Sequence, residues 1–167
     1  MVKLELQEIE IWRTNAAEAD AAFCLVQEYF EVVGVVVRED REKFIEEYFG
    51  EGRGFWLAKM DGELAGCIGL RRLPRSEELE LEDVKCAEIK RMYVREKFRG
   101  RGIGKALLAS VARIAQQENC YAMRWEVLNW NRPAIELYQS MGGTFLDQWR
   151  SVLLKDEALR RLAEKAR

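Results

Sequence analysis

The sequence predicts a single α/β (α+β) domain over residues 1–167, in which one sheet is flanked by helices. Three observations lead to this fold class. The chain has 167 residues, of which 49% are hydrophobic, and this is enough for one domain with a buried core. Several segments alternate apolar and polar residues or flank an Asp-Gly pair, as strands do. Other segments repeat apolar residues at helical spacing, and a glycine-rich turn joins one strand directly to a helix.

One strand and two helices are predicted first. Residues 8–13 (EIEIWR) alternate as in a strand. Asn15, with Glu18 three residues later, is typical of a capping box, and apolar residues then recur at helical spacing down to Gly34. A second helix is expected over about residues 38–49.

A β-hairpin follows these helices. Residues 54–60 and 63–73 form its two strands, because the Asp61-Gly62 pair between them favours a two-residue hairpin turn. Residues 76–83 (SEELELED) then carry five acids in eight residues. Two interpretations stay open for this stretch: a solvated loop, or a collar that attracts a cationic amine.

The next strand, over residues 84–95, contains an irregularity. Strict alternation would place four side chains on one face, those of Glu88, Lys90, Met92 and Val94. The run from Met92 to Val94 is continuously apolar, however, which strict pleating does not explain. A β-bulge would interrupt the alternation at this point, and bulges often lie beside active sites.

The remaining elements complete an alternation of helices and strands. Pro in a first helical turn and Gly after a last turn frame one short helix. In order, we expect a helix over about residues 102–118, a strand over 121–128, a short helix between Asn131 and Gly142, a strand that includes Trp149, and a closing helix over 156–166.

The turn between the strand at 84–95 and its helix is a candidate anion site. It holds three glycines in five positions, so the backbone can approach a ligand closely, and the helix start offers unpaired N–H groups. The segment from Lys85 to Lys105 has eight basic residues against Glu88 and Glu96, a local charge of +6 in a chain of formal charge -2. A solvated charged face would also explain the basic residues, but not the glycines.

Two common phosphate loops are disfavoured by spacing. A Walker A loop requires a Gly five residues before Gly104 and a Ser or Thr after Lys105, where this chain has Arg99 and Ala106. The dinucleotide fingerprint requires Gly-x-Gly-x-x-Gly, and the third glycine arrives one residue early.

The segment AEIKRMYVREKFRGRGIGKALL resembles the acetyl-CoA-binding motif of the GNAT superfamily of N-acetyltransferases, whose pattern is Arg/Gln-x-x-Gly-x-Gly/Ala. A second signature, Asn-x-x-Ala-x-x-x-Tyr, is met by Asn131, Ala134 and Tyr138. The C-terminal half is similar to the spermidine/spermine (diamine) and thialysine acetyltransferase branch. The resemblance implies a mixed sheet of six to seven strands with splayed central strands. It also implies acetyl-CoA as co-substrate.

The resemblance assigns cofactor contacts by motif position. Backbone N–H groups of the turn would hold the pyrophosphate, the strand would pair with pantetheine, and the Asn motif would position the arm near the thioester. The residues implied are Met92, Tyr93, Val94, Arg99, Gly100, Arg101, Gly102, Ile103, Gly104, Lys105, Asn131 and Ala134.

Two catalytic residues are predicted from the same resemblance. Glu88 aligns with a glutamate that acts as general base in some members, directly or through water. Its alternative role is a strand carboxylate paired to Lys90 or Arg124. Tyr138 would protonate the departing CoA thiolate, although helical spacing alone also allows a packed aromatic.

The chain has no histidine and four scattered cysteines. Serine-histidine and cysteine-histidine hydrolase schemes are therefore excluded, and no metal site is expected. The cysteines are expected to be reduced thiols.

The acceptor is expected to be a small-molecule amine, such as a polyamine or an amino acid. Glu28 and Tyr29 on the first helix are candidate substrate contacts, with an exposed helix face as the alternative. A protein N-terminal or lysine acetyltransferase and a non-catalytic acyl-CoA sensor are the other functions considered. Neither nucleic acid nor membrane is an expected partner, a homodimer is possible, and the expected location is cytoplasmic.

Overall fold

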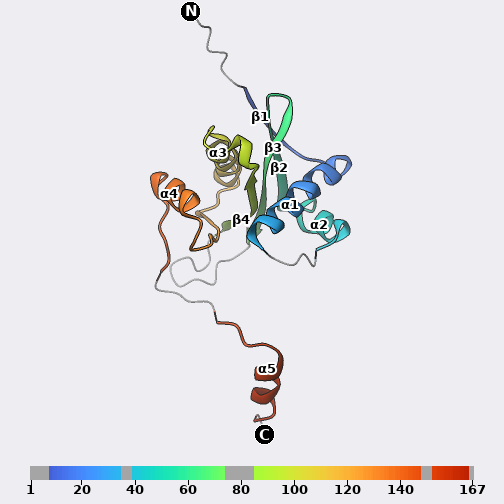
Figure 1. The fold of residues 1–167 in the computed structure, drawn as a ribbon, viewed down its shortest axis with the longest axis vertical. Coiled ribbons are helices and arrows are strands. Elements are labelled where there is room, and N and C mark those ends of the chain that lie inside the picture. Colours follow the sequence, from blue (N-terminus) through green and yellow to red (C-terminus); the bar gives the residue numbers. More distant parts are fainter. Residues whose placement is uncertain (1–7, 35–38, 74–84, 148–151, 166–167) are drawn as a thin grey trace, which may run out of the picture. The chain divides into compact units, whose positions relative to one another are not determined.

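The structure is a computed structural model that describes residues 8–34, 39–73, 85–147 and 152–165 (Figure 1). These residues fall into two compact units, and the chain passes from the first to the second between Glu126 and Val127. The first contains β1 (Ile9–Arg13), α1 (Ala19–Val33), α2 (Arg41–Tyr48), β2 (Arg53–Met60), β3 (Glu63–Leu73), β4 (Cys86–Val94), α3 (Ile103–Gln117) and β5 (Ala122–Arg124), with short 3-10 helices at Ala16–Glu18 and Glu96–Phe98. The second contains α4 (Arg132–Ser140) and α5 (Asp156–Ala163).

The strands of the first unit form one mixed sheet in the order β1-β2-β3-β4-β5. The first four strands pair antiparallel, whereas β4 and β5 pair parallel. The predicted α/β class is therefore confirmed. The described part of the chain contains five strands rather than six or seven. The predicted strand at Trp149 and the acidic stretch 76–83 lie outside the described residues.

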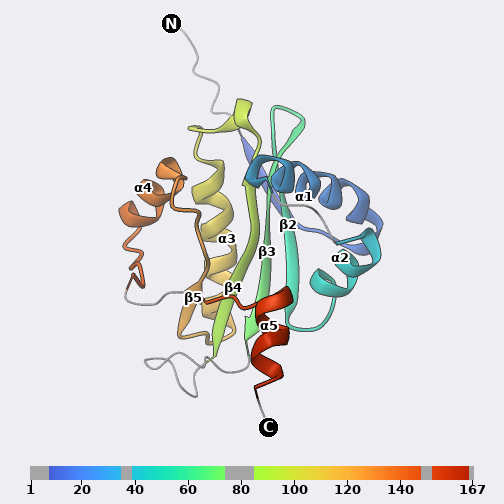
Figure 2. The same ribbon diagram turned by 60° about the horizontal axis from the view of Figure 1, so that its bottom comes forward.

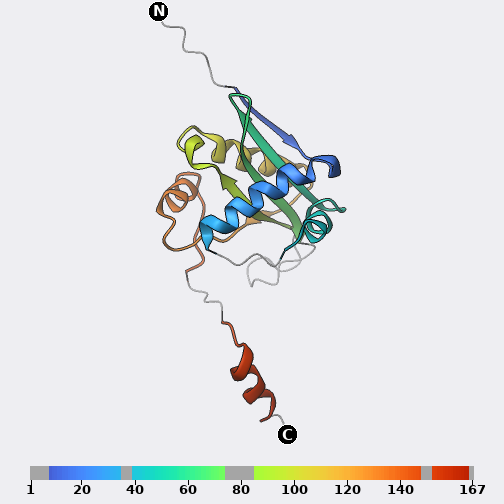
Figure 3. The ribbon, with the colours of Figure 1, turned by 45° about the vertical axis from the view of Figure 1, so that its right-hand side comes forward.

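Helices cover both faces of this sheet. Figures 2 and 3 show α1 and α2 against one face and α3 against the other. The core below α1 and α2 is rich in aromatic side chains, because Phe44 and Tyr48 of α2 pack with Phe55 of β2 at ring-centroid distances of 5.0–5.2 Å. This packing holds α2 over β2 and β3.

The predicted helix starts are confirmed. Asn15 accepts a hydrogen bond from Ala17 N, and the Glu18 side chain accepts one from Asn15 N, so that the capping box precedes α1. Asp40 caps α2 by accepting from Lys43 N at 2.9 Å.

A bulge interrupts β4 where the sequence predicted one. Gly69 pairs with Lys90 and Cys67 pairs with Tyr93, so two residues of β4 lie opposite one residue of β3. Arg91, inside the bulge, has a left-handed φ of 53°. The extra residue reverses the alternation: Tyr93 continues the face of Glu88 and Lys90, whereas strict alternation predicted Met92 and Val94 there.

Pairing between β4 and β5 is short. Three residues of β4 pair with β5, and the ladder ends at Glu88 opposite Arg124, while β4 itself continues to Val94. The predicted strand at 121–128 thus pairs only over its first half, because residues 125–128 leave the strand conformation. The ladder between these two strands thus ends at Glu88, and the expected splay beyond it stays a prediction.

Candidate active site

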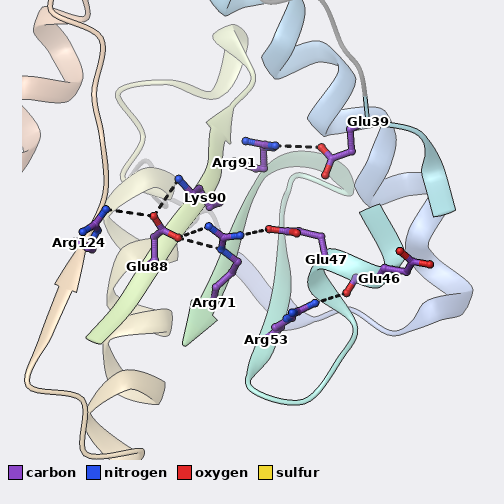
Figure 4. Close-up of polar contacts among 9 residues, drawn as sticks. All are labelled: Glu39, Glu46, Glu47, Arg53, Arg71, Glu88, Lys90, Arg91 and Arg124. Carbon is purple, nitrogen blue, oxygen red and sulfur yellow. Dashed lines mark hydrogen bonds and ion pairs between the residues drawn. The ribbon is translucent and has the colours of Figure 1, made fainter. Parts of the chain in front are cut away.

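A row of charged side chains crosses the sheet at the point where β4 and β5 part (Figure 4). Glu88 lies at its centre, between its cross-strand neighbours Arg71 on β3 and Arg124 on β5. Glu47 reaches the row from α2, and Lys90 follows Glu88 on the same face of β4. The row therefore forms because register places opposite charges on facing positions of three strands.

Both oxygens of the Glu88 carboxylate are engaged. Oε2 accepts from Arg71 Nη2 at 2.5 Å and from Arg71 Nε at 3.0 Å. Oε1 lies 3.1 Å from Lys90 Nζ and 3.8 Å from Arg124 Nη2. Arg71 Nη1 also donates to Glu47 Oε1 at 2.6 Å. Arg71 thus ties α2 to the centre of the row.

The environment of Glu88 keeps it ionised. Its side chain is only 7% exposed, and this burial acts to raise the pKa of the carboxyl. Hydrogen bonds from Arg71 and Lys90 act in the opposite direction and prevail, so the pKa of Glu88 lies below its ordinary value. A carboxylate in this state is able to accept a proton, but it is a weak base.

The sequence predicted some of these contacts and missed others. Pairing of Glu88 with Lys90 or Arg124 was one of its two alternatives, and both pairs are present. Arg71 and Glu47 were not predicted as site residues. The signal in the sequence for Arg71 is faint: two arginines, Arg71 and Arg72, follow the apolar and glycine residues 64–70 of one strand.

A second ion pair flanks the row at the bulge. Arg91 Nη2 lies 3.2 Å from Glu39 Oε2, and the guanidinium of Arg91 lies over the Phe30 ring at 4.6 Å. The pair connects the start of α2 to the irregular part of β4.

Glu28 and Tyr29, the predicted substrate contacts, lie on α1. Both oxygens of Glu28 accept from Arg95, with the shortest distance 2.6 Å, and these bonds, opposed by burial, lower the pKa of Glu28. Tyr29 is partly buried against the aromatic core, with its ring 5.4 Å from that of Phe30. Their role toward a substrate stays a prediction.

The glycine turn after β4 has the backbone that an anion site requires. Gly100 and Gly102 have left-handed φ values of 74° and 85°, and a side chain at either would meet no atom within 4 Å. Gly102 begins α3 without any side-chain cap. Ile103, Gly104 and Lys105 form the first turn of α3, whose N–H groups have no intrahelical partner by position.

The basic side chains of the turn are spread over several contacts. Arg99 Nε donates to Val94 O at 2.9 Å, and Arg101 Nη2 contacts Asp61 Oδ2 at 2.7 Å across the hairpin turn. Lys105 is exposed. Arg99 and Arg101 therefore anchor the turn, while Gly100 and Gly102 face open space.

The second signature forms the start of α4 in the second unit. Asn131 caps this helix by accepting from Ala134 N at 3.4 Å, with Pro133 in the first turn. Tyr138 is the buried residue of α4. The predicted roles of these residues toward a cofactor stay predictions.

Two general findings concern the described residues. They contain no group of three or more His, Cys, Asp or Glu residues that could hold a metal ion. No helix formed by them is both long and apolar enough to cross a membrane. The predicted cytoplasmic location stays a prediction.

Comparison with protein families identifies the class of this chain. Residues 10–143 match the acetyltransferase (GNAT) family. The match covers most of the chain and includes the glycine turn and the Asn131 motif. The chain therefore belongs to the acetyltransferase (GNAT) family, as the resemblance predicted.

Individual relatives refine this comparison. A thialysine N-ε-acetyltransferase of Sus scrofa is 38% identical over 77 residues, which cover 44% of this chain and 45% of that protein. An L-ornithine N5-acetyltransferase of Arabidopsis thaliana is 37% identical over 71 residues, which cover 42% of this chain and 31% of that protein. The matches to thialysine acetyltransferases span about half the length of those relatives.

Solved structures share the fold. An acetyltransferase from Clostridium acetobutylicum, solved with acetyl-CoA, has a TM-score of 0.73 at 14% identity and covers 88% of this chain and 97% of its own. An aminoglycoside N-acetyltransferase in complex with CoA has a TM-score of 0.74 at 15% identity and covers 93% and 99% of the two chains. At these identities the likeness concerns the fold.

Proposed function

We propose that this protein transfers an acetyl group from acetyl-CoA to the primary amine of a small molecule. The observation that carries the proposal is the sequence of features along β4 and after it. The ladder of β4 with β5 ends at Glu88, β4 bulges at Arg91, and after the short 3-10 helix at Glu96–Phe98 a glycine turn opens into the uncapped start of α3. Membership of the acetyltransferase (GNAT) family supports it. So do the relatives named for acetylation of thialysine and ornithine, both small amines.

The turn suits the pyrophosphate of CoA. Backbone N–H groups from Arg99 to Lys105 and the positive end of the α3 dipole attract anions. Open space beside Gly100 and Gly102 allows a phosphate to approach the backbone. The proposed contacts of pantetheine are the backbone groups of Met92, Tyr93 and Val94.

Acetyl-CoA supplies an activated acetyl thioester, and the residues of this chain must remove a proton from the acceptor amine. An alkylamine with a pKa near ~10.4 is mostly protonated at neutral pH and attacks only after losing that proton. We assign this proton to Glu88, directly or through water, because Glu88 is ionised and lies where β4 and β5 part. The neutral amine then forms the new C–N bond, and the C–S bond breaks as Tyr138 protonates the leaving thiolate. The extra proton on the new amide nitrogen then returns to the Tyr138 phenolate, directly or through water.

Release of free thiol from acetyl-CoA in the presence of amines is the decisive measurement. A panel of polyamines, amino acids and aminoglycosides should contain at least one acceptor that raises thiol release well above the rate without amine. Tyr138→Phe should lower kcat by about 10²-fold, in the range of lost general acid catalysis, while acetyl-CoA still binds. Arg53→Gln, on β2 and outside the proposed site, serves as the control and should keep full activity.

Two outcomes would contradict parts of the proposal. If Tyr138→Phe turns over at the normal rate, Tyr138 is not the acid, although the function stands. If acetyl-CoA binds but no amine or peptide acceptor ever releases thiol, the protein is an acyl-CoA sensor and not an enzyme.

A further inference from the structure

The hairpin formed by β2 and β3 contacts the region of the glycine turn through two ion pairs. Arg101 Nη2 lies 2.7 Å from Asp61 Oδ2. Lys97 Nζ pairs with Glu63 Oε2. Lys97 belongs to the 3-10 helix before the turn and Arg101 to the turn itself, whereas both carboxylates belong to the hairpin. The hairpin therefore supplies negative partners to two cations beside the proposed phosphate site.

One buried aromatic ring lies against both cations. The ring of Phe98 is 4.9 Å from Lys97 Nζ and 5.7 Å from Arg101 Cζ. The face of an aromatic ring attracts a cation without neutralising its charge. The side chains of Lys97 and Arg101 are nevertheless 58% and 28% exposed. Both cations are therefore held in place and still within reach of a ligand.

Other contacts also fix the hairpin at this place. Arg95 Nη1 donates to Leu64 O at 2.8 Å, and Arg95 N donates to Ala65 O at 2.9 Å. Asp61 and Gly62 have φ values of 53° and 80°, and a type I′ hairpin turn requires a positive φ at both of its central residues. The two ion pairs are therefore not needed to keep the hairpin beside the turn, and their carboxylates are open to exchange with another anion.

We infer that a phosphate group of CoA replaces Asp61 and Glu63 as the partner of Arg101 and Lys97, so that the two carboxylates limit the affinity for the cofactor. The inference rests on the proposed function and adds the hairpin to its cofactor site. Exposed ion pairs are weak, so their exchange costs little. A phosphate offers more acceptor oxygens than a carboxylate, and guanidinium and ammonium groups both bind it well.

The Kd of CoA, measured by titration calorimetry without any amine, tests this inference. Asp61→Asn removes the charge but keeps the shape of the side chain, and Asn-Gly favours the same type I′ turn. Its Kd for CoA should be at least about threefold lower than that of the wild-type protein, and adding Glu63→Gln should lower it further. Arg101→Met should instead raise the Kd by about tenfold, and Lys97→Met should raise it as well.

Glu96→Gln is the matched control. Glu96 is an exposed carboxylate of the same 3-10 helix, but it is not the partner of Lys97 or Arg101 in the ion pairs of the described residues. Its Kd for CoA should stay within about twofold of the wild-type value.

Truncated ligands identify the phosphate. A gain in Asp61→Asn that is seen with CoA but not with 3′-dephospho-CoA assigns the 3′-phosphate, and a gain that is kept with 3′-dephospho-CoA assigns the pyrophosphate. Pantetheine has no phosphate and should bind Asp61→Asn no better than it binds the wild-type protein.

The inference is wrong if Asp61→Asn binds CoA no more tightly than the wild-type protein, or if Glu96→Gln or pantetheine shows the same gain. Because no acceptor is present, these results do not depend on acetyl transfer. The expected changes in Kd without thiol release for any amine would overturn the proposed transfer reaction alone. Absence of CoA binding by the wild-type protein would overturn both.

Discussion

Arg71 is the residue on which the charge state of Glu88 depends most directly. It donates two hydrogen bonds to Glu88 Oε2 and a third to Glu47, so it joins β3, β4 and α2. Burial of Glu88 acts to raise its pKa, and the hydrogen bonds from Arg71 and Lys90 lower it. Removing Arg71 leaves the effect of burial opposed by fewer partners.

We therefore predict that Arg71→Gln raises the pKa of Glu88. A base works only while ionised, so activity is lost as the pH falls through its pKa, and a raised pKa moves that loss to higher pH. The acidic limb of kcat/KM, measured from about pH 4 to about pH 8, should shift upward relative to the wild-type protein.

Arg53→Gln is the matched control for this prediction. Arg53 also lies on a strand and donates to α2, through Glu46 O at 2.6 Å, but it does not contact Glu88. The acidic limb of kcat/KM against pH for Arg53→Gln should coincide with that of the wild-type protein. An unmoved limb in Arg71→Gln would show that Glu88 is not the group whose ionisation controls the rate.

Tyr48 gives a prediction about stability. Its side chain is 1% exposed, and its hydroxyl has no hydrogen-bond partner within the part of the chain that the structure describes. Burial also raises the pKa of this phenol, so it stays neutral. An unpaired buried hydroxyl costs about 1–3 kcal/mol.

We predict that Tyr48→Phe keeps or increases the free energy of unfolding, by up to about 2 kcal/mol, in urea denaturation. Tyr48→Ala should lose roughly 3–5 kcal/mol, because it also removes a ring packed against Phe44 and Phe55. A loss of more than about 1 kcal/mol in Tyr48→Phe would mean that the hydroxyl has a partner after all.

At the scale of elements, β3 approaches α2 and β4 closely because it has a glycine, Gly69, at the point of contact. A Cβ at Gly69 would lie 2.5 Å from Tyr48 Cε1 and 3.1 Å from Lys90 O. The Tyr48 ring belongs to the buried core, so it has little room to move away. Gly69 thus lets α2 pack onto the sheet directly beside the bulge.

Gly69→Ala should lower the free energy of unfolding by about 1–3 kcal/mol, the usual cost of overpacking. Combining it with Tyr48→Leu should cost less than the sum of the two single changes, since the clashing ring is then absent. Gly50→Ala is the control, because the nearest atom to its Cβ lies 3.7 Å away. Full additivity in the double variant would contradict the proposed clash.

The elements themselves were largely predictable, and the reason is local. Asn15 with Glu18, Asp61 with Gly62, and Pro133 after Asn131 each set a boundary through contacts within a few residues. Lys90 lies two residues from Glu88, so alternation alone placed them on one face.

Contacts between β3 and β4 were not predictable from such rules. No two-residue turn joins these strands, and a bulge shifts their register by one residue. The pairing of Arg71 with Glu88 depends on that register. The bulge also explains why strict alternation placed Met92 on the face of β4 that Tyr93 occupies.

For the whole molecule, the lowered pKa values of Glu28 and Glu88 predict sensitivity to acid. A carboxyl whose pKa is lower in the folded than in the unfolded state contributes stability above its unfolded pKa, near ~4.3. That contribution disappears as the pH falls through the folded-state value. The protein should therefore lose stability below about pH 4.3.

Thermal unfolding of the double variant Glu28→Gln with Glu88→Gln measures this effect. It should be less stable than the wild-type protein at neutral pH, and the difference should shrink as the pH falls below about 4. Asp20→Asn, in an exposed pair with Arg41, should change stability by no more than about 1 kcal/mol. A difference that is constant with pH would show that these carboxylates do not titrate with folding.

The bulge at Arg91 has a consequence for how relatives of this chain should be compared. Because one added residue exchanges the two faces of a strand, β4 is in effect two half-strands of opposite phase joined at Arg91. An alignment gap of one residue at this position looks minor when identities are counted. In space it would send every later side chain of β4 to the opposite layer of the molecule, so positions after Arg91 are comparable only between chains that keep the insertion.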